Sequence, residues 1–141
     1  MKRVAALDIG GKRIGIALSD PEKMIAFPKG FVEAEKALEE IPHLFRQWSV
    51  GAVVVGIPVT LRGEEGPQAL KVKEFLSSLE DAFRKEGMEI EIVLWDERLS
   101  TAQAEAFLRQ AGYKAGKMRR RVDAASATLI LQSYLDFLRR A

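Results

Sequence analysis

The sequence of 141 residues contains no cysteine and a single histidine. A disulfide-linked scaffold is therefore excluded, and a zinc site built from cysteine and histidine is disfavoured. No apolar run approaches the roughly 20 residues that a membrane-spanning helix needs. The N-terminus also lacks the cleavage pattern of a signal peptide. We therefore expect a cytoplasmic protein with no membrane association.

Neither sign of charge dominates, because 22 lysine and arginine residues face 20 aspartate and glutamate residues, which leaves a net charge of +2. Together with 48% hydrophobic residues, this balance excludes disorder and predicts a single domain over residues 1–141. Basic residues nevertheless gather near the C-terminus with no acid among them: Lys114, Lys117, Arg119, Arg120 and Arg121. A cluster of positive charge like this one is typical of a segment that binds an anionic partner. The alternative interpretation is a solvated loop with no binding role.

Hydrophobic patterning predicts strands at residues 4–9, 13–19, 26–32, 50–56 and 88–95. Gly10 and Gly11 separate the first two strands and are typical of a two-residue hairpin turn with positive φ. Pro28 and Gly30 interrupt the third strand, which favours an edge strand or a bulge. The continuous apolar run at residues 52–55 favours a strand that is buried on both faces in a parallel sheet.

Apolar spacing of three to four residues predicts helices at 33–48, 68–86, 100–112 and 122–140. Pro42 either kinks the first helix or begins a new one. The predicted order is therefore β-β-β-α-β-α-β-α-α. Because crossover connections return parallel and right-handed, we expect an α/β fold. Its mixed five-stranded sheet combines an antiparallel meander with two parallel strands, and helices flank both faces.

Acidic residues end two of the predicted strands, at the edge where open α/β sheets bind ligands. Asp8 ends the first strand and shares a face with Val4 and Ala6. It either binds a metal or caps the hairpin through an Asx-type turn. Asp96 and Glu97 end the last strand on opposite faces, so the pattern does not choose between them.

Asp123 is expected to start the last helix, where aspartate is a favoured N-cap. The small residues at 124–127 would let this helix end pack close to the sheet and bring Asp123 near the strand-end acids. Three carboxylates that meet in this way repel one another unless cations lie between them. Hard oxygen ligands select Mg²⁺ or Mn²⁺, and a pair of such ions supports phosphodiester hydrolysis.

Four segments resemble, in order, the sequence signatures of the YqgF (RuvX) family: residues 7–20, 54–58 with Gly63, 96–101, and 123–132. These RuvC-like proteins are described both as Holliday junction resolvases and as pre-16S rRNA nucleases. The resemblance covers almost the whole chain, and four motifs in the same order are highly specific. It implies an RNase H-like fold and a metal-dependent endonuclease.

The resemblance also implies the site residues. Asp8, Glu97 and Asp123 would be the catalytic acids that bind two Mg²⁺ or Mn²⁺ ions, and the family pattern favours Glu97 over Asp96. The residues expected to bind nucleic acid are Lys12, Arg13, Arg98, Arg119, Arg120 and Arg121.

The leading hypothesis from the resemblance is cleavage of structured RNA, namely precursor 16S rRNA in ribosome biogenesis, by a monomer or weak homodimer. Ribosomal subunits or processing factors would then be partners. Resolution of branched DNA is the alternative, and it would require a dimer with two active sites. Actin-like ATPases also carry an Asp-x-Gly hairpin, but they close two domains around a nucleotide. A non-catalytic nucleic-acid-binding factor is the third alternative, and the three acids argue against it.

Overall fold

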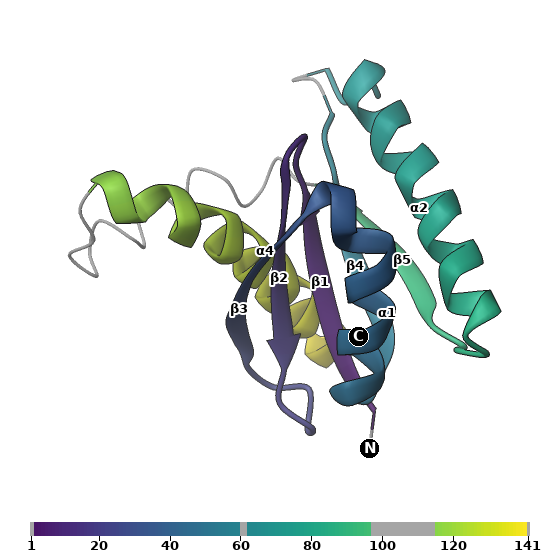
Figure 1. The fold of residues 1–141 in the computed structure, drawn as a ribbon. Coiled ribbons are helices and arrows are strands. Elements are labelled where there is room, and N and C mark those ends of the chain that lie inside the picture. Colours follow the sequence, from purple (N-terminus) through teal and green to yellow (C-terminus); the bar gives the residue numbers. More distant parts are fainter. Residues whose placement is uncertain (1, 60–61, 97–114, 141) are drawn as a thin grey trace.

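The computed structural model describes residues 2–59, 62–96 and 115–140. For residues 115–124 and 140 it describes only the helical backbone. The fold is built on a single mixed sheet. The strands follow the order β3-β2-β1-β4-β5. β1 pairs antiparallel with β2, and β2 with β3, whereas β1, β4 and β5 are parallel (Figure 1). Their bounds are β1 Arg3–Ile9, β2 Arg13–Ser19, β3 Ala26–Glu33, β4 Val50–Ile57 and β5 Glu91–Asp96.

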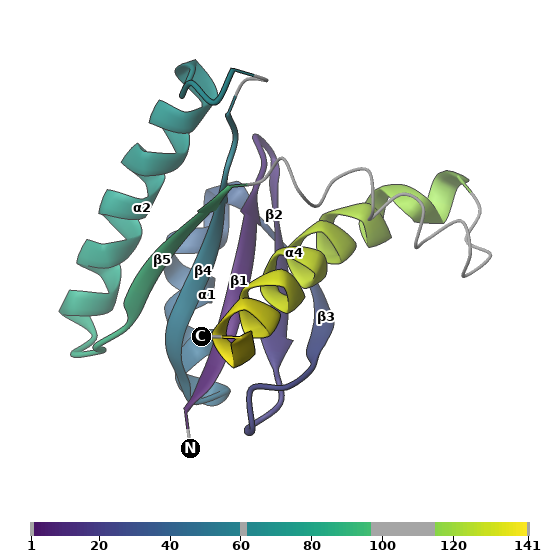
Figure 2. The same ribbon diagram turned by 180° about the vertical axis from the view of Figure 1, so that it is seen from behind.

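Helices cover both faces of this sheet. α1 and α2 lie on one face, and α4 crosses the other diagonally (Figures 1 and 2). Their bounds are α1 Ala37–Gln47, preceded by the short 3₁₀ turn η1 Ala34–Lys36, then α2 Pro67–Lys85 and α4 Ala115–Arg140. The predicted α/β architecture is therefore confirmed. None of the helices in the described part of the chain is long and apolar enough to span a membrane.

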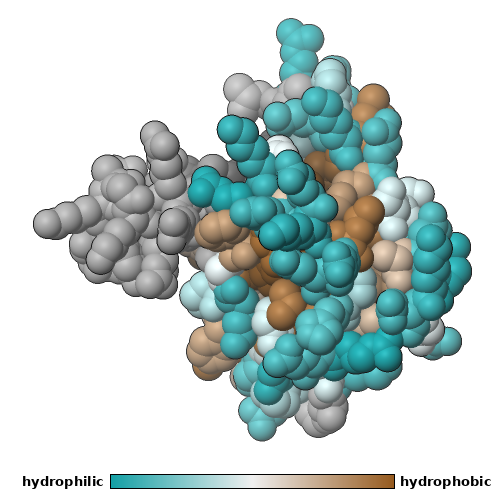
Figure 3. Space-filling model, viewed as in Figure 1, coloured by the Kyte–Doolittle hydropathy of each residue, from teal (hydrophilic) through white to brown (hydrophobic). Residues whose placement is uncertain are grey.

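Alternation of side chains along the strands creates two hydrophobic cores. The core beneath α1 and α2 includes Leu7, Ile14, Phe45, Val53 and Phe83. The core beneath α4 includes Val4, Ala6, Val54, Ile130, Leu131 and Leu135. β1 and β4 contribute to both cores, as the continuous apolar run in β4 predicts for a central parallel strand. Figure 3 shows hydrophilic residues over most of the outer surface of α1 and α2, with hydrophobic residues visible between them.

The connection from β1 to β2 differs from the predicted two-residue turn. It comprises residues 10–12, and neither glycine has a positive φ. The Gly10 N–H donates to the carbonyl oxygen of Arg13 at 3.0 Å, and a Cβ at Gly10 would lie 2.7 Å from that oxygen. Gly10 is therefore required for close backbone approach, and the predicted reason, positive φ, is wrong.

The last helix begins earlier than predicted. α4 starts at Ala115, so Asp123 lies inside the helix and is not its N-cap. Arg119 to Arg121 are helical as well, which contradicts the alternative of a solvated loop. Lysine, methionine and arginine all favour helices, and this local preference prevails over the N-cap preference of aspartate. Lys114 and the predicted helix at 100–112 lie outside the described residues.

Three further expectations concern the edge strand β3, the proline in α1 and the start of β5. β3 is an edge strand with a register irregularity opposite residues 15–17, as Pro28 and Gly30 predict. α1 continues through Pro42, so no new helix begins there. β5 starts at Glu91 and not at 88, because the Met88 N–H donates back to the Phe83 carbonyl at 2.9 Å and is used to end α2.

Gln132 fastens α4 to the start of β3. Its Oε1 accepts the Ala26 N–H at 2.9 Å, and its Nε2 donates to the Met24 carbonyl at 3.1 Å. Both bonds join residues more than 100 positions apart. Gln132 therefore fixes the position of α4 relative to the β2–β3 turn.

Asp20 shapes this same turn and should make its stability depend on pH. Its carboxylate accepts the N–H groups of Met24 at 2.7 Å and Ile25 at 2.9 Å. The bond from Ile25 is the largest cause that lowers the pKa of Asp20 below its ordinary value of 3.8. A lowered pKa means that the stabilisation is present above the unfolded value and is lost as pH falls through the folded value.

We expect Asp20→Ala to lower the melting temperature at neutral pH, and we expect the difference from the parent to be smaller in strong acid, where protonation of Asp20 removes its stabilising effect. Thermal denaturation followed by circular dichroism at the two pH values measures this difference. A gap of equal size at both pH values would contradict the role assigned to Asp20.

Candidate active site

Asp8 lies at the carboxyl end of β1, the central strand, on the face that α4 covers. Val4 and Ala6 pack in the core beneath α4, whereas Leu7 packs in the other core. Alternation along the strand therefore places Asp8 on the α4 face, as predicted. Its side chain is half-buried and has an interaction partner.

Glycine stands beside Asp8 on both neighbouring strands. Gly15 of β2 is its direct antiparallel partner. On β4, Val55 pairs with Leu7, so Gly56 lies one residue further along, level with Asp8. Because a glycine has no side chain, neither neighbouring strand places one beside the carboxylate, and both glycines are buried.

Aromatic residues complete this row at both edges of the sheet. Phe31 pairs with Gly15, and the Arg13 guanidinium lies 5.2 Å from the centre of the Phe31 ring. Trp95 pairs with Gly56 at the other edge. The row therefore crosses all five strands at one level: Phe31, Gly15, Asp8, Gly56 and Trp95.

Trp95 also holds α4 against the sheet. Its ring makes edge-to-face contacts with Tyr134 at 5.5 Å and with Phe137 at 5.6 Å between centroids. Burial raises the pKa of Tyr134, with a further contribution from the negative charge of Glu91. These contacts tie the C-terminal half of α4 to the end of β5.

Asp96 lies on the opposite face from Asp8. It follows Trp95 and pairs with Ile57. Ile92, two residues before Leu94 and four before Asp96, packs against the core beneath α1 and α2. Strand alternation therefore turns Asp96 toward that layer. Glu97 and Arg98 lie outside the described residues.

The backbone of Asp123 lies on α4, within the helix that crosses the face of Asp8. Toward its N-terminal end at Ala115, α4 crosses the sheet in the direction of β3 and projects beyond that edge strand (Figures 1 and 2). Arg119, Arg120 and Arg121 belong to this part, and only their backbone is described. Among the described side chains, no three potential metal ligands come together. The convergence of the three acids remains a prediction.

Lys12 and Arg13 lie close to the site in the chain. Lys12 is exposed in the β1–β2 connection, and its carbonyl accepts the Ala34 N–H at 2.8 Å. Arg13 lies on the same face as Gly15 and Asp8. Sequence reasoning missed Phe31 as a member of this row, because only the pairing of β2 with β3 reveals its position.

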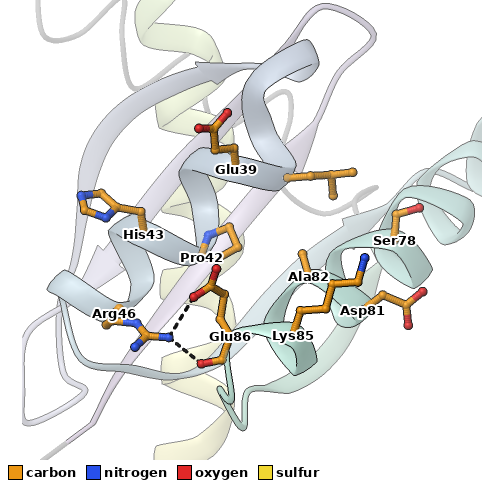
Figure 4. Close-up of a pocket in the computed structure, with 10 residues that line it drawn as sticks. Glu39, Pro42, His43, Arg46, Ser78, Asp81, Ala82, Lys85 and Glu86 are labelled. Carbon is orange, nitrogen blue, oxygen red and sulfur yellow. Dashed lines mark hydrogen bonds and ion pairs between the residues drawn. The ribbon is translucent and has the colours of Figure 1, made fainter.

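A further cavity lies elsewhere. It encloses about 760 Å³ between α1 and α2 (Figure 4). At its wall, Arg46 donates to the Glu86 carbonyl oxygen at 2.6 Å and contacts the Glu86 carboxylate at 3.5 Å. His43 also lines it and is exposed. The sheet separates this cavity from Asp8, so it is not the candidate active site.

A mixed sheet in this order, with a carboxylate at the end of its central strand, defines an RNase H-like fold of the RuvC type. The structure of Thermus thermophilus RuvC in complex with Holliday junction substrate matches with a TM-score of 0.58 and 16% identity, over 97% of this chain and 96% of that one. At this identity, the likeness establishes the fold.

The chain belongs to the RuvX family, whose model, described as a Holliday junction resolvase, matches residues 2–137. Relatives named "Putative pre-16S rRNA nuclease" include one from Chloroflexus aurantiacus, 40% identical over 94% of this chain and 86% of the relative. Another, from a Sulfurihydrogenibium species, is 42% identical over 98% of this chain and 92% of the relative. The predicted family is confirmed, and the family and its fold support nuclease function.

Proposed function

We propose that this chain is an endonuclease that hydrolyses phosphodiester bonds in structured RNA, with Asp8 as a central catalytic acid. The observation that carries the proposal is the placement of Asp8 between Gly15 and Gly56. A half-buried carboxylate at the end of a central strand, with no side chain from either neighbouring strand against it, lies at the edge where open α/β sheets bind ligands. The names of the relatives support precursor 16S rRNA as the substrate.

Glu97 and Asp123 are the proposed partners of Asp8. Asp96 faces the α1 and α2 layer, so the described part of β5 favours the next residue as the acid on the α4 face. Asp123 is on α4, the helix that covers this face. The family resemblance selects the same acids.

The carboxylate chemistry of this site fits a hard divalent cation. Asp8, Glu97 and Asp123 would hold Mg²⁺ or Mn²⁺ through oxygen atoms. The chemistry that such ions supply when bound is Lewis-acid activation of water and neutralisation of phosphate charge. The protein's own contribution would be to fix the carboxylates on a rigid strand and a packed helix, with no side chain from the neighbouring strands against Asp8.

Incubation of the pure protein with precursor 16S rRNA tests the proposed function. We expect endonucleolytic products with Mg²⁺ or Mn²⁺ and none with EDTA. A four-way DNA junction in parallel reactions tests the second candidate, which the likeness to junction-bound RuvC favours. Binding of RNA without cleavage under every metal condition would instead favour the non-catalytic binding factor.

We propose that residues 1–141 form a single domain that acts in the cytoplasm as a monomer or weak homodimer. Its proposed partners are ribosomal subunits or processing factors. Junction resolution would need two active sites on one assembly. Mass measurement in solution, with and without a junction, therefore distinguishes the two substrates: a dimer induced by the junction supports resolution of DNA.

The basic part of α4 should extend the binding surface for nucleic acid. It projects beyond the sheet (Figure 1) and carries Arg119, Arg120 and Arg121. Replacing all three with glutamine should weaken RNA binding and lower the slope of log affinity against log salt by about 2 to 3, because fewer counterions are released. Fluorescence anisotropy across a salt series measures both quantities.

A matched control replaces Arg46, Arg84 and Lys85, which lie on the opposite face of the sheet. This variant has the same change of net charge. If both variants change the slope equally, the effect comes from net charge alone and α4 has no specific role in binding.

A further inference from the structure

A second cavity lies beside the candidate active site, on the other face of the sheet. It encloses about 350 Å³ where β1 and β4 end and α2 begins. Ile9, the residue after Asp8, lines it, together with Pro58 and Phe75. Asp8 and this cavity therefore lie on either side of the same strand end, one residue apart along β1.

Gly11 at the edge of this cavity has no structural reason to be glycine. Its φ is not positive, and a Cβ placed on it would meet nothing within 4 Å. Gly10 differs, because its Cβ would strike the Arg13 carbonyl oxygen. The open backbone at Gly11 thus leaves room at the cavity edge that the fold itself does not use.

Two polar side chains stand unpaired over the apolar wall. Gln68 and Lys71 lie one turn apart on α2, are exposed, and line the cavity. Within the described part of the chain, neither forms a hydrogen bond or an ion pair. Lys73 on the same helix differs, since it pairs with Glu65 at 2.5 Å. A free ammonium group beside apolar walls suits a ligand that joins a flat apolar ring to an anion.

We propose that this cavity binds an unpaired nucleotide next to the scissile phosphate, with its base against Phe75 and Pro58 and its phosphate near Lys71 and Gly11. The volume lies near the lower end of the roughly 300–1,000 Å³ range of small-ligand pockets. A base that remains paired in a duplex cannot enter such a pocket. The substrate is therefore single-stranded beside the cut, and this assignment rests on the proposed function because it places RNA at Asp8.

Binding measurements test this pocket without requiring cleavage. In an Asp8→Asn background, anisotropy compares a short single-stranded RNA with a blunt-ended RNA hairpin whose two strands are joined by a non-nucleotide linker, so that it has no unpaired base. Lys71→Gln and Gly11→Val should each weaken single-strand binding by about tenfold, and hairpin binding by less than about twofold, because only an unpaired base reaches the pocket. Gly11→Val is expected to fold normally, since the space above Gly11 is open.

Lys85→Gln, at the far end of the same helix, is the matched charge control and should leave both affinities unchanged. A single strand that carries 2-aminopurine reports stacking directly: its fluorescence should fall on binding to the parent and fall less with Phe75→Leu. If the variants lose equal affinity for the single strand and the hairpin, or lose none for either, the proposed role of this cavity is wrong. Absence of cleavage by the parent, with selective loss of single-strand binding in the variants, would overturn the nuclease proposal alone.

Discussion

Asp8→Asn should reduce the cleavage rate by about 10³-fold or more, the scale seen when catalytic or charge-stabilising groups are removed. Asparagine matches aspartate in shape, and the half-buried site has glycine on both sides. The fold should therefore survive the change, with a melting temperature close to that of the parent. Rates with Mg²⁺ and thermal denaturation without it measure the two effects.

The same variant gives a readout of metal binding that is independent of cleavage. A ligand that binds only the folded state raises the melting temperature. We expect Mg²⁺ or Mn²⁺ to raise it for the parent and to have little effect on Asp8→Asn. A normal rate in the variant, or an equal metal-induced shift in both proteins, would remove Asp8 from the site.

Glu97→Gln and Asp96→Asn form a matched pair that asks which acid of β5 acts with Asp8. Because Asp96 lies on the face of α1 and α2, its replacement should leave most of the activity. Replacement of Glu97 should reduce the rate as severely as Asp8→Asn does. A severe loss of rate with Asp96→Asn and a mild loss with Glu97→Gln would instead show that Asp96 is the metal ligand. Strand alternation would then not predict the face of the functional acid.

Leu131→Ala should give the largest loss of stability. Leu131 is fully buried, at 0% exposure, in the core that α4 forms with Ala6 and Val54. Removing such a side chain typically costs about 2–5 kcal/mol, because a cavity remains. In a domain of this size the melting temperature should fall by about 10 °C. Chemical denaturation followed by circular dichroism measures the free energy directly.

Leu138→Ala on the same helix is the control, since Leu138 is 41% exposed. Its cost should stay below about 1 kcal/mol. Losses of similar size in the two variants would mean that the packing of α4 on the sheet contributes little to stability. Cleavage by Leu131→Ala should also fail at a lower temperature than cleavage by the parent, since α4 carries Asp123.

Much of the fold could be predicted because its signals are local. Alternation along residues 4–9 predicts the face of Asp8, and the apolar run at 52–55 predicts a central parallel strand. The start of α4 could not be predicted from Asp123, because a favourable N-cap residue competes with the helix preference of the residues before it. Only local propensity summed over several residues decides that competition.

The row through Asp8 depends on long-range pairing, which no local pattern encodes. The sequence shows Gly15 and Gly56 as small residues in strands, but only the register of β2 and β4 places both beside Asp8. The same is true of Phe31 and Trp95, which are ordinary aromatic strand residues until four strand pairings place them at the same level. Two of the three predicted acids still await a test of where their side chains lie.

The paired glycines beside Asp8 give a rule for comparing natural variants. Gly15 and Gly56 are both buried, so a branched residue at either position would force methyl groups into packed surroundings next to Asp8, while residue 8 itself is unchanged. On the proposed role of Asp8, we expect homologues that keep this aspartate but carry a larger residue at 15 or 56 to have its carboxylate displaced and to cleave more slowly. The three positions 8, 15 and 56 should therefore be compared together.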